Sequence, residues 1–250
     1  AVALVYVSQQ RGAIRAIRDG HLNEQPLIDL NGRVTTLFDQ GLLAVAVDPT
    51  GSHLYAYFTD EQGDSTLVAW PLDERGRPDA ASERLILHQA QDDVYHNGGG
   101  LQFDREGDLY LTLGDGGLLG DWRNRAQHLD ILLGKILRIH PTPDEARAYE
   151  VPDDNPWIGF SDAAPEVWAL GTRNPYRIDV DPDTGDVWVA DVGLRCAEEV
   201  TRIAGGRGGA NLGWHHREGG LAFVGGGPPD LLDPVYWYPH DPGCAVIGGA

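Results

Sequence analysis

Short stretches of alternating apolar and polar residues run through most of the chain, and turns rich in Gly, Pro and Asp separate them. This two-residue period is typical of β-strands with one buried face. Residues 4–19 and 42–60 each predict a pair of strands joined by a tight turn. Further strands are predicted at residues 65–73, 83–89, 135–141, 165–172, 176–193, 198–204 and 233–239. Residues 124–134 lose the alternation and predict a short helix that ends at Gly134.

One pattern occurs three times, at residues 44–60, 101–115 and 178–192. Each copy is an apolar strand, an Asp, a few turn residues with a Gly, a second strand and a closing Asp. Asp accepts hydrogen bonds within its own turn and Gly adopts the left-handed conformation there, so the pattern is a repeated hairpin. Repeated small antiparallel sheets with long loops between them favour an all-β fold, a single β-propeller domain over residues 1–250. A β-sandwich is the alternative, because the repeat is degenerate.

The hairpin within residues 95–117 carries the strongest candidate chemistry. His96 stands before its first strand, beside three glycines, and Asp115 follows its second strand. Both open ends of a hairpin lie at the same edge of a sheet, so we expect His96 and Asp115 to be close in space. A carboxylate that holds an imidazole, next to glycines that let another molecule approach, suits a general base.

The chain is strongly acidic, with a formal net charge of −19 over 250 residues. This charge argues against a nucleic-acid partner and an anionic membrane surface, and it favours cation sites. No apolar run is long enough to span a membrane. The absence of Met favours a processed chain or a fragment. Cys196 and Cys244 would form one disulfide if they meet, which the sequence leaves open.

A series of short motifs resembles, in the same order, the soluble glucose and aldose sugar dehydrogenases of the glucose/sorbosone dehydrogenase type. The motifs are Gly41-Leu42-Leu43, His96-Asn97-Gly98-Gly99, Gly114-Asp115, Leu133-Gly134-Lys135-Ile136-Leu137-Arg138, Asp154-Asn155-Pro156, Gly171-Thr172-Arg173-Asn174-Pro175, Asp191-Val192-Gly193, Glu198-Glu199-Val200, Asn211-Leu212-Gly213-Trp214 and Pro234-Val235-Tyr236. Each motif alone is weak, but their collinear order covers nearly the whole chain. The resemblance implies a six-bladed β-propeller of four-stranded antiparallel sheets that uses pyrroloquinoline quinone (PQQ) and calcium. It further implies oxidation of an aldose sugar to its lactone, an external electron acceptor, and a periplasmic or extracellular location.

The resemblance also implies roles for single residues. His96 would remove the proton from the anomeric hydroxyl of the sugar while hydride passes to the quinone. Asp115 would orient and polarise His96. Contacts with the quinone would come from Asp39, His96, Arg173 and Asn174.

Two sets of candidate metal ligands follow near residue 195. The resemblance implies that the backbone carbonyls of Gly193 and Leu194 bind the calcium, which acts as a Lewis acid. Glu198 and Glu199 are candidates for a second cation site. Alternation along a strand lets only one of these two side chains point inward, so the other is expected to face solvent.

The cationic residues that would hold the PQQ carboxylates lie in the last blades of the family, and the family pattern continues beyond Ala250. The chain is therefore truncated, lacking the last blade or blades, or the propeller closes differently, or the cofactor site is incomplete. Two other functions stay open: a non-catalytic interaction module of the hedgehog-interacting type, and a calcium-dependent propeller lactonase built on Asp115, Asp191 and Asn174. The sugar and the oligomeric state stay open as well, since sugar specificity would lie in loops such as residues 117–125 and 215–232.

Overall fold

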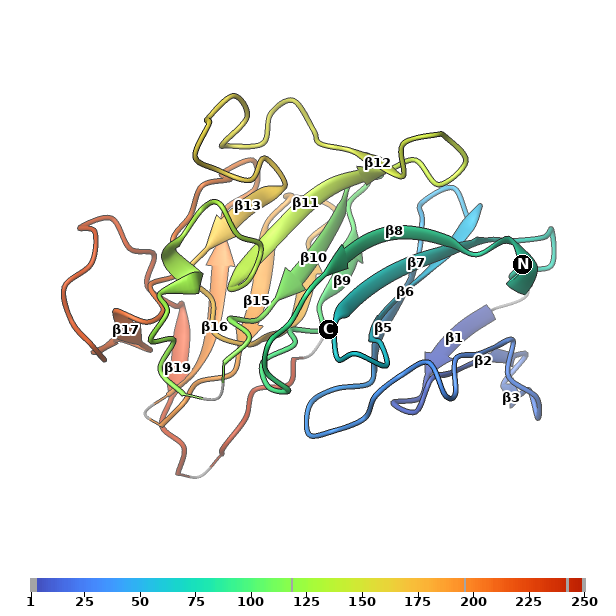
Figure 1. Ribbon diagram of the computed structural model, residues 1–250, viewed down its shortest axis with the longest axis horizontal. Coiled ribbons are helices and arrows are strands. Elements are labelled where there is room, and N and C mark those ends of the chain that lie inside the picture. Colours follow the sequence, from blue (N-terminus) through green and yellow to red (C-terminus); the bar gives the residue numbers. More distant parts are fainter. Residues whose placement is uncertain (1–3, 118, 196, 242, 249–250) are drawn as a thin grey trace.

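Four antiparallel sheets follow one another along the chain and fan out side by side in the computed structural model, which describes residues 4–117, 119–195, 197–241 and 243–248 (Figure 1). The fold is all-β and is that of a β-propeller, as the repeated hairpins predict. The sheets form a series, and not the two facing layers of a sandwich, so the sandwich alternative is wrong. No helix in the described ranges is long and apolar enough to cross a membrane.

Each sheet is built from strands that are close in sequence, as expected for propeller blades. The first sheet contains β1 (Leu4–Ser8), β2 (Ala13–Arg18), β3 (His21–Leu22) and β4 (Ile28–Asp29). The second contains β5 (Leu42–Val47), β6 (His53–Thr59), β7 (Ser65–Pro71) and β8 (Arg84–Gln89). The third contains β9 (Leu101–Phe103), β10 (Leu109–Leu113), β11 (Lys135–Pro141), β12 (Tyr149–Glu150) and β13 (Val167–Leu170). The fourth contains β14 (Pro175–Val180), β15 (Val187–Asp191), β16 (Glu198–Ile203) and β19 (Tyr236–Tyr238).

Four short elements lie outside these four sheets. The strands β17 (Arg217–Glu218) and β18 (Leu221–Ala222) form a separate two-stranded ribbon. Two single-turn 3₁₀ helices, η1 (Ala80–Ser82) and η2 (Arg125–Gln127), lie between strands of the second and third sheets.

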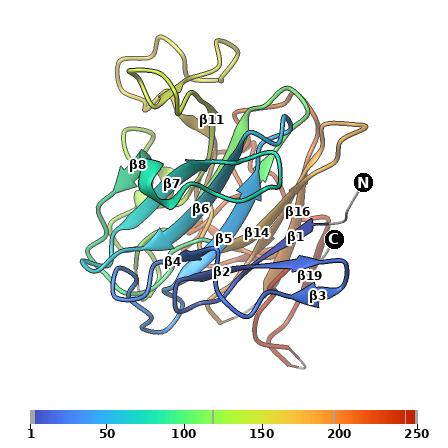
Figure 2. The same ribbon diagram turned by 90° about the vertical axis from the view of Figure 1, so that its right-hand side faces the viewer.

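Apolar side chains fill the space between successive sheets. Trp70 belongs to the core between the first and second sheets. Leu111 lies in the core between the second and third, and Trp168 in the core between the third and fourth. Seen from the side of the first sheet, β5 to β8 lie next to β1 and β2 (Figure 2). This face-to-face burial holds each blade against the next, so residues from different blades keep fixed relative positions at the strand ends.

The turns of the repeat form as predicted. The side chains of Asp48, Asp104 and Asp181 each accept a hydrogen bond from a backbone N–H of their own turn, at 2.8, 2.9 and 2.8 Å. These bonds fix the short β5–β6, β9–β10 and β14–β15 connections. The closing Asp115 and Asp191 are thereby carried to the opposite ends of their hairpins.

The predicted helix over residues 124–134 is wrong, because only the single turn η2 forms there. A helix would need the Arg125 and Ala126 carbonyls for its own hydrogen bonds. Instead, the buried Nζ of Lys135 donates to both of them, at 2.8 and 3.1 Å, and to the carbonyl of Leu133 at 2.7 Å. The Ala126 carbonyl also accepts from the N–H of Gly171. Burial lowers the pKa of the Lys135 ammonium to about 7.

Candidate active site

His96 and Asp115 meet at the open end of the β9–β10 hairpin, as the register of this pair predicts. The Nδ1 atom of His96 lies 2.6 Å from Oδ1 of Asp115, whose carboxylate is fully buried. A carboxylate only accepts hydrogen bonds, so Nδ1 carries a proton, and in the neutral imidazole Nε2 is then the nitrogen with the lone pair. Within the described ranges, Nε2 makes no hydrogen bond. The pair therefore has the arrangement of an oriented base whose proton-accepting nitrogen is free.

The backbone around His96 is held in a conformation that a non-glycine residue seldom adopts. His96 has a φ angle of 57°, in the left-handed region. The Asp39 carboxylate accepts from the N–H groups of His96 and Asn97, at 2.9 and 3.2 Å. A Cβ on Gly114 would lie 2.1 Å from the His96 carbonyl, so only glycine fits there. Specific contacts thus hold His96 in a strained backbone conformation, as is common at functional sites.

Asp39 also connects two distant blades. Besides the two backbone groups, its carboxylate accepts from the side-chain amides of Asn97 and Asn174, each at 3.2 Å. The Asn174 side chain in turn accepts from the N–H of Gly98 at 2.9 Å. In the structure, Asp39 and Asn174 thus position the His96 segment. Their contact with a cofactor stays a prediction.

Asp191 anchors the segment that contains Arg173 and Asn174. Its two carboxylate oxygens accept from the backbone N–H groups of Arg173 and Asn174, at 2.9 and 2.7 Å. Burial raises the pKa of Asp191 to about 7, against the opposing effect of these two hydrogen bonds. The Arg173 carbonyl then accepts from the N–H of Asp115 at 2.8 Å, which ties the third and fourth blades together.

The Arg173 guanidinium is buried at the same strand ends. Its Nη1 donates to the carbonyls of Val192 and Gly193, at 2.8 and 2.7 Å, and its plane lies over the Trp214 ring at 5.6 Å. Its Nε is buried and has no hydrogen-bond partner in the part of the chain that the structure describes. Burial lowers the pKa of this guanidinium. A buried cation with an unused donor is suited to receive an anionic group.

The predicted calcium ligands lie next to this arginine. The Gly193 carbonyl, one of the two predicted ligands, already accepts from Arg173. The other, on Leu194, belongs to a loop whose N–H groups are held by Glu218: Oε1 accepts from Leu194 and Arg195, at 2.6 and 2.7 Å. Glu218 is buried and was not identified from the sequence. The calcium role of both carbonyls stays a prediction.

Glu198 and Glu199 point to opposite sides of β16, as alternation predicts. The fully buried Glu198 accepts from Nε2 of His240 at 2.5 Å and from the N–H of Val246 at 2.7 Å. Glu199 accepts from the N–H of Gly219 and is not exposed either, so the expectation that one of the two faces solvent is wrong. The two-stranded ribbon and its neighbours cover this side of the strand. A cation held by these two residues stays a prediction.

Glu199 should make stability depend on pH. Burial raises its pKa from 4.5 to about 8, so the folded chain keeps a proton that the unfolded chain loses between these values. The free energy of unfolding should therefore fall as the pH rises from about 4.5 to 8. Glu199→Gln should flatten this fall in the free energy of unfolding, by on the order of 4 kcal/mol at pH 8 in urea titrations. The exposed Glu150→Gln serves as control, and identical pH profiles for all three proteins would refute the assignment.

Trp214 was quoted in a sequence motif but not identified as a site residue. Its indole Nε1 donates to Oδ2 of Asp115 at 2.7 Å, across 99 positions of the chain. The other oxygen of Asp115 accepts from His96 and from the N–H of Gly117. Both oxygens are thus engaged, as are those of Asp191, so neither side chain is directed to a shared ion. This arrangement gives the lactonase alternative no support.

Trp214 should be a positioning residue that acts through Asp115. Trp214→Phe keeps an aromatic ring, though a smaller one than the indole, and leaves a buried carboxylate without one donor, a loss of about 1–3 kcal/mol in stability. For the sugar oxidation that the sequence resemblance implies, kcat should fall roughly 10-fold in this variant, with a smaller change in KM, because the base is less well oriented. Trp188→Phe, on a half-exposed strand position, is the matched control. Equal kcat values for the two variants would show that the indole N–H has no part in orienting the pair.

A cavity of about 190 Å³ opens beside Asp115, and His96 is not among the residues that line it. Its lining includes Asp115, Gly116, Gly117 and the exposed side chains of Leu119 and Trp122. The cavity therefore lies against the loop of residues 117–125 in which specificity was expected. Leu118 in this loop and Cys196 lie outside the described residues, so the Cys196–Cys244 pairing does too.

Comparison with known proteins agrees with this geometry. A sequence profile described as glucose/sorbosone dehydrogenase matches residues 3–240. The chain belongs to this family. The resemblance inferred from the ordered motifs is therefore confirmed.

Three known proteins are similar to this chain. The aldose sugar dehydrogenase YliI of Escherichia coli is 33% identical over 163 residues, which cover 62% of this chain and 40% of that protein. The hedgehog-interacting protein of Mus musculus is 27% identical over 203 residues, or 73% of this chain and 29% of that protein. The PQQ-bound aldose sugar dehydrogenase of Streptomyces coelicolor superposes with a TM-score of 0.74 at 27% identity, covering 95% of this chain and 65% of that one. The chain thus spans less than two thirds of each of these proteins.

Proposed function

We propose that the protein containing this chain oxidises aldose sugars to lactones, with His96 as the general base and with PQQ and calcium as cofactors. The observation that carries the proposal is the His96–Asp115 pair, at 2.6 Å, with Nε2 of His96 free. Membership of the glucose/sorbosone dehydrogenase family supports the sugar dehydrogenase class. We further propose a periplasmic or extracellular location and an external electron acceptor, in line with the family resemblance.

The residues present fit an anionic quinone in part. PQQ carries carboxylates, and the buried Nε of Arg173 is a donor without a partner in the described ranges. Arg173, with Asn174 and His96 beside it, would hold the quinone. Calcium on the Gly193 carbonyl would require Arg173 to release that oxygen, since a second cation there would be repelled. Binding of an anionic group to Arg173 would favour this release.

The chain's own residues supply proton transfer and substrate orientation. Nε2 of His96 would take the proton of the anomeric hydroxyl as the C1 hydride leaves, so that aldose becomes lactone. When bound, the quinone supplies a two-electron acceptor for that hydride. The buried Asp115 carboxylate stabilises the imidazolium that forms. The cavity beside Asp115 is not lined by His96, so it would hold only a part of the sugar remote from the anomeric hydroxyl, against the apolar surface of the exposed Trp122.

Titration of the full natural protein with PQQ and CaCl2, followed by absorbance, tests the proposal. We expect saturable PQQ binding and then reduction of the quinone when glucose or another aldose is added. Arg173→Ala should weaken PQQ binding, whereas Arg105→Ala, on the exposed β9–β10 turn, should not. Absence of PQQ binding by the natural protein would refute the quinoprotein assignment.

A non-catalytic interaction module is the second candidate, and the similarity to the hedgehog-interacting protein favours it. Such a module would need neither a free Nε2 on His96 nor a buried carboxylate behind it. Binding of PQQ without sugar-dependent reduction, or no binding at all, would favour this candidate. The next measurement would then be partner capture with the natural protein.

A further inference from the structure

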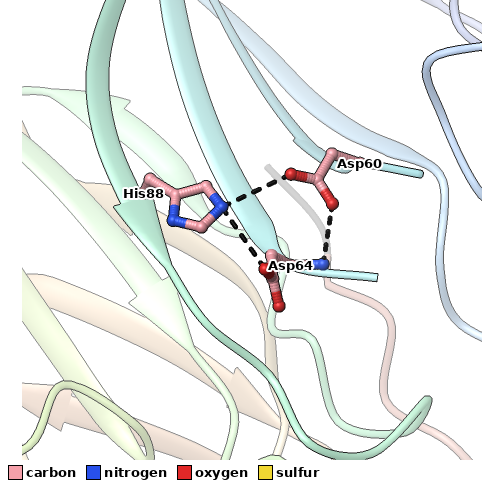
Figure 3. A group of neighbouring side chains, drawn as sticks. All are labelled: Asp60, Asp64 and His88. Carbon is pink, nitrogen blue, oxygen red and sulfur yellow. Dashed lines mark hydrogen bonds and ion pairs between the residues drawn. The ribbon is translucent and has the colours of Figure 1, made fainter. Parts of the chain in front are cut away.

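Two aspartates and a histidine, none of them assigned to the active site, meet at one end of the second blade (Figure 3). Asp60 directly follows β6, Asp64 directly precedes β7, and His88 lies on β8 opposite Thr66. Three neighbouring strands of one sheet therefore each bring one side chain to the same place. We propose that Asp60, Asp64 and His88 bind a divalent first-row transition-metal ion such as zinc.

The distances among the three side chains suit a small ion. Nε2 of His88 lies 3.4 Å from Oδ2 of Asp60 and 3.4 Å from Oδ2 of Asp64. Ligand atoms about 2.0–2.1 Å from a tetrahedral zinc are separated by roughly 3.4 Å. All three candidate ligand atoms lie within 4.8 Å of one another. The geometry therefore needs little change to accept an ion between them.

Each carboxylate is held by one oxygen and presents the other. Oδ1 of Asp60 accepts from the N–H groups of Gln62 and Asp64, at 2.9 and 3.0 Å, and Oδ1 of Asp64 accepts from the N–H of Gln91 at 2.7 Å. The oxygens that face His88 are the two Oδ2 atoms. The Asp60 Oδ2 also accepts from the Thr66 hydroxyl at 3.2 Å, a contact that helps to orient it. The ligands are thus oriented by their surroundings in the way that metal sites require.

The donor set selects the class of ion. A neutral imidazole nitrogen suits zinc, cobalt or nickel better than calcium or magnesium, which prefer oxygen ligands throughout. Two carboxylates balance the charge of a divalent ion. The side chains of Asp60 and Asp64 are 19% and 18% exposed and that of His88 is 43% exposed, so an ion could enter and retain water as a further ligand.

A bound ion would connect three strands of the second blade and the start of the loop that leads to His96. Gln91, which donates to Asp64, begins the five-residue stretch before His96. Zinc should therefore stabilise this blade, and its effect on the sugar reaction should be small because none of its ligands contacts His96. The site is independent of the proposed dehydrogenase activity.

Isothermal titration of the natural protein with ZnCl2, after removal of metals with EDTA, tests the proposal. Excess CaCl2 is kept in the buffer so that sites for hard cations and diffuse acidic surfaces are already occupied. We expect one zinc-binding event that raises the thermal unfolding temperature. His88→Ala and the isosteric Asp64→Asn should each weaken it by about 10-fold or more. His21→Ala, an exposed histidine on β3 of another blade, is the matched control.

Cobalt provides a second readout, because a Co²⁺ ion held by few ligands absorbs visible light more strongly than hydrated Co²⁺. This band should appear with the natural protein and His21→Ala and be lost in His88→Ala. The same zinc dissociation constant for the natural protein, His88→Ala and Asp64→Asn would overturn the proposal. No zinc binding by the natural protein would also overturn it, and would indicate that His88 only forms ion pairs with the two aspartates.

Discussion

Replacing His96 by alanine should lower kcat/KM for aldose oxidation by about 10²–10⁴-fold, the usual range for loss of a general base. The expected size follows from the geometry, because Nε2 is the free nitrogen of an imidazole whose Nδ1 is fixed by a buried carboxylate. His140 also has its Nδ1 on a buried carboxylate, that of Asp108, but its own side chain is 46% exposed and Asp108 is also paired with Arg138. The measurement is steady-state kinetics of the natural protein reconstituted with PQQ and calcium.

Two further variants separate proton transfer from structural damage. His96→Gln keeps much of the side-chain volume but cannot accept the proton as imidazole does. Its kcat/KM should therefore be nearly as low as that of His96→Ala. Asp115→Asn should also lower kcat/KM strongly, because the amide no longer holds the imidazole in the tautomer that accepts a proton at Nε2. His128→Ala, beside η2, is the control and should retain full activity. Retained turnover by His96→Ala with an unchanged unfolding temperature would remove His96 from the mechanism.

The proximity of His96 and Asp115 could be predicted because it depends on local rules. A hairpin with a two-residue period and a short Asp-Gly turn leaves little freedom in register, so the residues just beyond its open ends must meet. The same local rules predicted the blade hairpins and their Asp turns. Strand bounds inside these hairpins followed from alternation alone.

Contacts between blades could not be predicted in this way. The Trp214 bond to Asp115 and the Asn174 bond to Asp39 each join segments about 100 or more positions apart, and they depend on how one sheet packs on the next. Glu218 could not be identified as a buried site residue, since a lone glutamate on a two-residue strand resembles any surface residue in sequence. The error over residues 124–134 has the same origin: the carbonyls that a helix would use are taken by the buried Lys135. Local propensity was overridden by tertiary contacts.

The stability of the site should depend most on Asp191. Asp191→Ala removes the acceptor of two buried backbone N–H groups, those of Arg173 and Asn174, at 2.9 and 2.7 Å. Each buried donor left without a partner costs about 1–3 kcal/mol. The burial that raises the pKa of Asp191 to about 7 shows that its charge is itself unfavourable there, so part of this cost is offset. We expect a net loss of roughly 2–4 kcal/mol in the free energy of unfolding.

Urea unfolding of Asp191→Ala against Asp183→Ala measures this effect. Among the described residues the exposed Asp183 forms an ion pair with the exposed Arg105 alone, so its loss should cost less than about 1 kcal/mol. A lower urea concentration at the midpoint of unfolding, with an unchanged dependence of the free energy on urea, would locate the effect in the folded state. Equal midpoints for the two variants would mean that water replaces the carboxylate at both N–H groups. Because the Arg173 carbonyl also holds the N–H of Asp115, the Asp191 variant should further disturb the pair that orients His96, and its kcat should fall even where it is fully folded.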